Sequence, residues 1–205
     1  MTGFNLHTFF EAALYPLFDL TDTEKGMLLS GTKLLHLKSD SFLIRENTVA
    51  NDLFFLHKGM VRSFYTKDHR EINTEFFPEN NFLTALTSFL TGEKTNLSFQ
   101  CLEESEMVVI PKTLLETLLI QDQKWHILFN QILRNEFIKK CRRESSFLLH
   151  DSNERYLHFL EQFPRSEERI PLFHIASYLG MSPETLSRIR SKKLKQIDLS
   201  QVNKI

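Results

Sequence analysis

A glutamate and an arginine lie four residues apart near the C-terminus, within the segment SPETLSRI at residues 182–189. Residues at this spacing share one face of a helix. Arginine can donate two hydrogen bonds to guanine in the DNA major groove, and glutamate can accept one from cytosine. Glu184 and Arg188 are therefore candidates for reading base edges.

The residues around this pair fit a helix-turn-helix. Gly180 marks the turn, because glycine accepts the left-handed conformation that ends a helix. Ser182 is a good N-cap, and Pro183 suits the first position of the second helix. Leu186 and Ile189 are three residues apart and face inward together. The apolar or small positions are Leu172, Ile175, Ala176, Leu179, Met181, Leu186 and Ile189.

The outward-facing polar side chains of the second helix are the predicted DNA contacts. Hydroxyls and lysine would hold phosphates and set the register, while Glu184 and Arg188 read bases. The alternative is two amphipathic helices around a glycine without a DNA role. It explains the apolar positions, but not why the cap, the glycine and the polar face share one register. The predicted set is Ser182, Glu184, Thr185, Ser187, Arg188, Ser191 and Lys192.

Composition restricts the class of protein. A chain of 205 residues has room for one large domain or two small ones, and its net charge is −1. Attraction to DNA must therefore come from a local basic patch, which the sequence provides after Met181. No apolar run approaches the length of a membrane helix, and no signal peptide is evident. Two cysteines, Cys101 and Cys141, indicate reduced thiols in a cytoplasmic protein.

The N-terminal part predicts helices and then a β-rich domain. Residues 5–33 look helical, and a short helix is expected near residues 84–90. Many short apolar runs, separated by polar clusters, are typical of a small sandwich or barrel. The expected strands cover residues 42–44, 53–56, 60–65, 72–77, 97–102 and 107–110.

Residues 123–150 contain neither proline nor glycine and predict one long helix. Such a helix would be about 40 Å long at 1.5 Å per residue. It would either pack only against its own barrel or pair with a second copy of itself, and its length favours pairing. The candidate dimer residues are Leu128, Phe129, Ile132, Leu133, Phe137 and Cys141.

A break follows at His150, and Asp151 with Glu154 forms the capping pattern of a new helix. We therefore predict an α+β protein in three parts. Residues 1–122 form a β-roll or jelly-roll sensor domain, residues 123–150 a dimerisation helix, and residues 151–205 a helix-turn-helix domain.

This organisation resembles the Crp/Fnr family of bacterial transcription regulators. The segment SPETLSRI is similar to the family's recognition helix, and Gly59 in LFFLHKGMVRSFY matches a strand-turn glycine. The resemblance implies a cyclic-nucleotide-binding-like sensor domain and a homodimer on a two-fold operator in double-stranded DNA. It also implies RNA polymerase and a small-molecule effector as further partners.

The sequence departs from the family pattern in its ligand pocket, its recognition helix and its C-terminal tail. The family holds cyclic AMP with a Gly-Glu pair and an Arg-Ser pair, but here no Gly-Glu lies around residues 84–86 and no arginine lies near residues 94–96. An anion buried without such donors is costly. We expect no binding of cyclic AMP, an unknown effector or none, and a pocket that is apolar or filled by phenylalanines. Pro183 replaces a base-reading arginine, and the tail after Leu194 is too short for the usual wing. The degenerate pocket comprises Thr84, Ala85, Leu86, Lys94, Thr95 and Asn96.

Two functions other than a dimeric DNA-binding regulator are compatible with parts of the sequence. The runner-up is a ligand-binding signalling module whose helix-turn-helix contacts proteins. An enzyme ranks third, since the six glycines form no G-x-G and neither G-x-S-x-G nor H-E-x-x-H occurs. The eight histidines show no short metal-ligand spacing. We therefore assign no catalytic residue, metal or cofactor.

Overall fold

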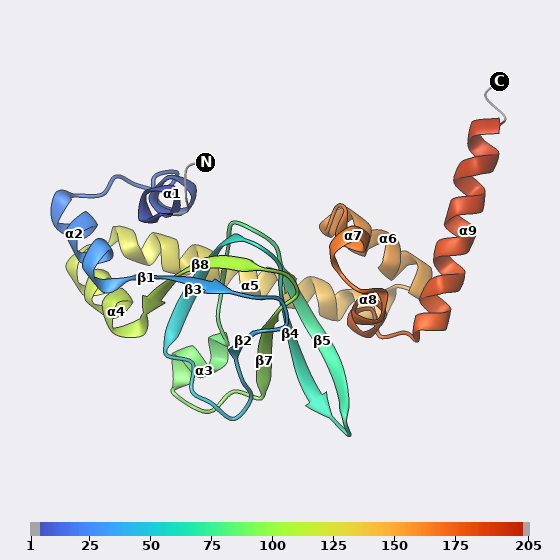
Figure 1. The fold of residues 1–205 in the computed structure, drawn as a ribbon, viewed down its shortest axis with the longest axis horizontal. Helices are drawn as coiled ribbons and strands as arrows, with labels where there is room; N and C mark the ends of the chain where they lie inside the picture. The colour runs from blue at the N-terminus through green and yellow to red at the C-terminus, as the bar shows by residue number, and fades with distance from the viewer. Residues whose placement is uncertain (1–4, 203–205) are drawn as a thin grey trace.

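The computed structural model describes the backbone of residues 5–202 and the side chains of residues 5–192. A β-roll occupies the centre, a long helix runs along it, and a helical head lies at one end (Figure 1). No helix within the described residues is both long enough and apolar enough to cross a membrane.

Two antiparallel four-stranded sheets form the roll. Their strands include all six predicted runs and two further strands, β1 and β6. Both were missed because β1 is mostly exposed and β6 has only three residues. The first sheet orders β1 (Lys33–Leu37), β8 (Ser105–Pro111), β3 (Asp52–Lys58) and β6 (Asn81–Leu83). The second orders β2 (Phe42–Ile44), β7 (Leu97–Cys101), β4 (Val61–Lys67) and β5 (Arg70–Phe77).

Phenylalanines dominate the core between the sheets and the helices that cover them. Phe9, Phe55 and Phe99 are at most 2% exposed. They come from the N-terminal helix and from both sheets, so their burial fixes the sheets and that helix together. The helices before α5 are α1 (Leu6–Phe9), the π-helix η1 (Phe10–Leu14), α2 (Asp22–Gly31), α3 (Leu86–Thr91) and α4 (Lys112–Gln121).

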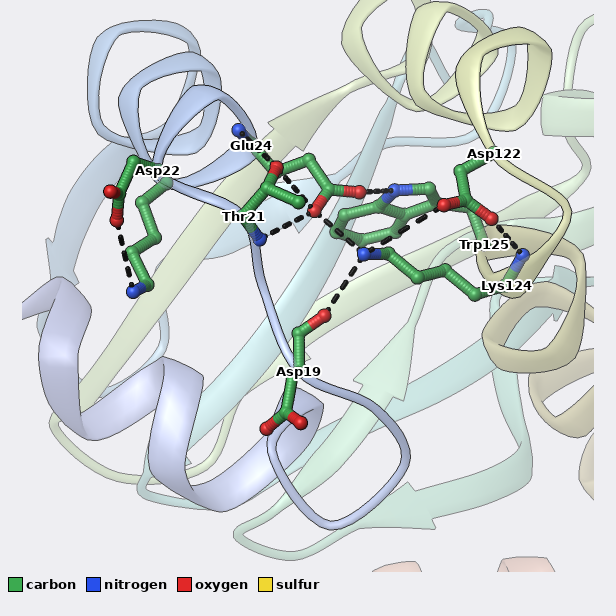
Figure 2. Close-up of polar contacts among 8 residues, drawn as sticks. Asp19, Thr21, Asp22, Glu24, Asp122, Lys124 and Trp125 are labelled. Carbon is green, nitrogen blue, oxygen red and sulfur yellow. Dashed lines mark hydrogen bonds and ion pairs between the residues drawn. The ribbon is translucent and has the colours of Figure 1, made fainter.

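A buried carboxylate ties helix α2 to the start of the long helix. Figure 2 shows Glu24 accepting hydrogen bonds from Trp125 Nε1 at 2.8 Å, Lys124 Nζ at 2.7 Å and Thr21. Burial alone would raise the pKa of Glu24. The bonds from Lys124, Thr21 and Trp125 outweigh burial and lower the pKa to about 2. Thr21 and Glu24 also form the capping box of α2.

The predicted long helix is present as α5 (Lys124–Leu149). Its first half packs on the roll, where Leu128 is 3% and Ile132 is 6% exposed. Their assignment to a dimer interface is therefore wrong, because their side chains belong to the core of their own roll. The periodicity of apolar residues identified the buried face of the helix, but it could not show whether the roll or a second copy of the chain covers that face.

The head comprises α6 (Ser152–Gln162), α7 (Ser166–Arg169), α8 (Leu172–Tyr178) and α9 (Pro183–Val202). Its apolar cluster includes Tyr156, Phe159 and Ile175, and it also contains Met60 and Phe76 from the roll. The head therefore packs directly on the roll. Helix α9 continues through Val202, so no wing strand follows it within residues 5–202.

Candidate nucleic-acid interface and ligand pocket

Helices α8 and α9 form the predicted helix-turn-helix. Gly180 has a φ of 63°, and Ser182 Oγ accepts a hydrogen bond from Thr185 N at 3.2 Å. Ala176 is fully buried and Leu186 is 1% exposed. The turn, the cap and the helix crossing thus have the geometry expected from residue type.

The structure places the seven predicted DNA-contact residues on the first turns of α9 and the residue before it. Six are exposed and Thr185 is half-buried. Arg188 Nη2 donates to Thr185 Oγ1 at 3.4 Å, and a hydrogen bond from Ser182 lowers the pKa of Glu184. An ionised Glu184 and an exposed guanidinium at Arg188 suit cytosine and guanine edges.

The start of helix α6 adds to this face and was not predicted. A groove of about 400 Å³ brings Ser152 and Asn153 beside Thr185, Arg188 and Lys192. Some 30 residues of sequence separate the two sides, so no local spacing could reveal their contact. Small polar side chains here could contact phosphate next to the base-reading residues.

Two arginines outside the motif hold its turn. Arg143 Nη1 on α5 donates to Tyr178 O at 2.8 Å, and Arg155 Nε on α6 donates to Leu179 O at 3.0 Å. A Cβ atom on Gly180 would lie 2.6 Å from the Phe147 ring of α5. The turn therefore sits directly on the long helix, a contact that the sequence did not indicate.

A polar cluster fastens helix α8 to the roll. Arg62 is 3% exposed, and its Nη1 lies 3.2 Å from His174 Nδ1 and 3.1 Å from Asn73 Oδ1. Asn73 Nδ2 also lies 3.2 Å from His174 Nδ1. Two donors converge on Nδ1, so this nitrogen must accept and the imidazole must be neutral. Glu71 compensates the arginine at 2.6 Å.

A second ion cluster joins α7 to the turns of the roll. Arg169 pairs with Glu79 at 2.6 Å, bonds Glu103, and donates to Gly59 O at 3.0 Å. The hydrogen bonds that Arg169 donates to the two carboxylates raise its pKa. The cluster is partly exposed, so it orients the head more than it stabilises the fold.

We expect acid to weaken the head's attachment through His174. Burial and the nearby Arg62 lower the pKa of His174 to about 4, against 6.5 for a free histidine. As pH falls below 6.5 the unfolded chain binds a proton that the folded chain excludes. The free energy of unfolding should then fall by about 3 kcal/mol by pH 4. Unfolding curves of the wild type and His174→Gln should therefore converge as pH falls. Parallel pH profiles would contradict this role.

All six residues of the predicted degenerate pocket line one cavity of about 380 Å³. The expectation of a filled or apolar pocket is wrong, because Phe77 and Phe99 form only part of its wall. Most of the charged remainder could not be foreseen, since it comes from β5 and α5. It comprises Glu75, Glu93, Glu136, Lys140 and Arg143 beside the predicted Lys94.

Glu75 is the unusual acid of this cavity. Burial raises its pKa to about 7, and the attraction of Lys139 only partly opposes that rise. Its one hydrogen bond within the described residues is to its neighbour's backbone, from Phe76 N at 3.3 Å. The carboxyl is thus available to a further partner in the cavity. No group of three His, Cys, Asp or Glu side chains among the described residues could hold a metal.

The remaining dimer candidates divide between core and surface. Phe129 packs on the roll and Leu133 is half-buried, whereas Phe137 is 68% exposed and Cys141 is exposed. Leu148 is 77% exposed and, by helical spacing, shares the face of Phe137 and Cys141. An apolar stripe therefore lies on the exposed face of the second half of α5.

Comparison with known proteins agrees with this architecture. Residues 34–122 match the cyclic nucleotide-binding domain family. FixK2 from Bradyrhizobium japonicum is 19% identical, with a TM-score of 0.72 over 80% of this chain and 85% of that one. The Xanthomonas campestris global regulator CLP, described as responsive to c-di-GMP, is 16% identical. Its TM-score is 0.69 over 86% of this chain and 93% of that one.

A protein from Eubacterium rectale described as a transcriptional regulator of the Crp/Fnr family is also 16% identical. Its TM-score is 0.68, over 86% of this chain and 85% of that one. No curated protein matches at the sequence level. The similarities confirm an α+β chain with a cyclic nucleotide-binding domain and the fold of Crp/Fnr regulators.

Proposed function

We propose that this chain, which has the Crp/Fnr fold, is a sequence-specific DNA-binding transcription regulator and not an enzyme. It would act in the cytoplasm as a homodimer on a two-fold operator, with an effector other than cyclic AMP. The carrying observation is the exposed polar face of α9, where Glu184 and Arg188 stand one turn apart.

Arg188 would donate both hydrogen bonds to guanine O6 and N7, and Glu184 would accept from cytosine N4. Thr185, Ser191 and Lys192 would hold phosphates. The start of α6 would approach the DNA backbone next to these phosphates, because the side chains at the start of α6 line the same groove as Arg188. Pro183 adds no hydrogen bond, so each half-site is read through two side chains.

The experiment is selection of binding sites from random duplex DNA. We expect a two-fold symmetric sequence whose half-sites lie about one helical turn, roughly 34 Å, apart. Its affinity should fall steeply with salt, because phosphate contacts release counterions. Recovery of unrelated sequences with no salt dependence would refute the proposal.

One observation favours a second candidate, a module whose head contacts proteins. Helix α9 runs uninterrupted from Pro183 to Val202, so the phosphate contacts of a wing strand are missing within the described residues. The salt titration separates the two, because only DNA binding produces a slope that grows with the number of phosphates contacted.

The exposed stripe of α5 carries the proposed dimer. Replacing Phe137 with glutamate should cost about 2 kcal/mol or more in dimerisation, because a central aromatic anchor is lost from both copies. Monomer stability should change little, since the side chain is exposed. Light scattering across a dilution series, with thermal unfolding alongside, measures both effects.

The matched control is Ile120→Glu on α4, an apolar position that is 87% exposed and lies off the stripe. It should leave the association state unchanged. If Phe137→Glu also leaves it unchanged, the stripe is not the dimer interface.

A further inference from the structure

Arg143 takes part in two separate sites. Its side chain lines the β-roll cavity of about 380 Å³. Its guanidinium also donates to Asn73 O on β5 at 3.1 Å and to Tyr178 O on α8 at 2.8 Å. One side chain of the long helix therefore touches the cavity, the roll and the head.

At the head, Arg143 holds the end of helix α8 just before the turn. Tyr178 is the last residue of α8, and a carbonyl at a helix C-terminus has no partner within its helix. The guanidinium supplies that partner, and its carbon lies 4.3 Å from the centre of the Tyr178 ring. Gly180 begins the left-handed turn two residues later. The start of α9 thus depends on where Arg143 holds the end of α8.

At the cavity, Arg143 faces acids that compete for it. Glu75 has no ion pair with a lysine or arginine among the described residues, yet it lies in the cavity with Arg143 and attracts it. A carboxylate carries a full negative charge and can accept two parallel hydrogen bonds from arginine, which a neutral carbonyl cannot. An additional negative charge in the cavity would favour a guanidinium turned away from Tyr178.

We propose that Arg143 relays the occupancy of the cavity to the helix-turn-helix: an acidic group of a small-molecule ligand competes with the Tyr178 carbonyl for its guanidinium. The chemical class of the ligand is a carboxylate or phosphate compound. Two positions of one side chain give the two states that such coupling requires. The relay rests on the proposed regulator, but its test needs no DNA.

Backbone hydrogen exchange reports on the turn directly. The amides of Leu179, Gly180 and Met181 bond carbonyls of α8 at 2.9, 3.2 and 3.0 Å. In Arg143→Met, which keeps the length of the stem, these amides should exchange about tenfold faster, the effect of losing roughly one charged hydrogen bond. The matched control is Arg142→Met, at the exposed neighbouring position.

A second variant changes the charge of the cavity wall, so the effect of the cavity on the turn can be measured without a ligand. At pH 8 Glu75 carries its charge, and Glu75→Gln removes the wall's own competitor for Arg143. Exchange of the three amides should slow by about threefold or more, the effect of strengthening a bond by under 1 kcal/mol. Glu93→Gln is the control, because Glu93 lines the same cavity but is exposed.

The double variant decides the question. With Arg143→Met present, Glu75→Gln should no longer change exchange at the turn. An equal effect in both backgrounds, or none in the wild type, would overturn the relay. If Arg143→Met unfolds the head, Arg143→Lys replaces it, since lysine keeps the charge without the two-pronged donor. Failure to bind DNA would refute the proposed regulator and leave the exchange result intact.

Discussion

The Arg188→Ala variant should bind the selected operator far more weakly than the wild type. Losing a bidentate contact to guanine costs about 1–3 kcal/mol at one site. In a two-fold dimer both half-sites lose it, so the total should approach about 2–6 kcal/mol if the sites are independent. Titration of labelled operator at fixed salt measures the change.

The sequence specificity of the variants distinguishes a contact to a base from a contact to the DNA phosphates. Arg188→Ala should bind the operator and a duplex altered at the contacted base pair almost equally. Lys192→Ala is the control, because losing a phosphate contact in each half-site should weaken binding to all sequences alike and reduce the salt slope by about 2, or about 1 per contact. If Arg188→Ala behaves like Lys192→Ala, then Arg188 contacts phosphate and the base assignment is wrong.

The Glu24→Ala variant should be destabilised by about 3–5 kcal/mol, the usual cost of removing one partner of a buried ion pair. It leaves the Trp125 indole N–H without its acceptor and removes the carboxylate from the Lys124 ammonium, which keeps a backbone carbonyl as acceptor. Chemical denaturation measures the loss. Asp22→Asn is the control, because Asp22 is fully exposed and its contact with Lys25 should contribute under about 1 kcal/mol.

Acid should reproduce part of the Glu24 effect. The folded pKa of about 2 lies below the ordinary 4.5, so the stabilisation is complete above pH 4.5 and is lost as pH falls towards 2. The loss in the wild type should approach about 3 kcal/mol across that range. Glu24→Ala should lack this part of the profile, and an identical profile would exclude the assignment.

Local patterns predicted elements and caps well. The strand runs, the helix without proline or glycine, and the sequence from Gly180 to Leu186 all depend on interactions within a few residues. The six pocket residues also came together as expected, because α3 and the chain leading to β7 form one side of the cavity.

Contacts between distant segments could not be predicted. Arg62 and His174 lie 112 residues apart, and nothing in either neighbourhood indicates the other. Leu128 and Ile132 have the apolar character of an interface, yet the roll covers them first. The charged side chains of α5 that enter the cavity appear in sequence as an ordinary solvated helix face.

The shared apolar cluster has a consequence for how this protein could be divided. Phe76 is 1% exposed, and its ring lies 5.2 Å from Tyr178 and 6.1 Å from Phe159 of the head. Cutting the chain at residue 150 would separate the aromatic side chains of the head from Phe76. Both the head and the roll would then expose apolar surface that is buried in the intact protein. The chain passes from the long helix to the head at residue 150, but the unit that folds cooperatively with the head also includes part of the roll. Exchanging heads between proteins of this shape would require exchanging the β4–β5 hairpin with them.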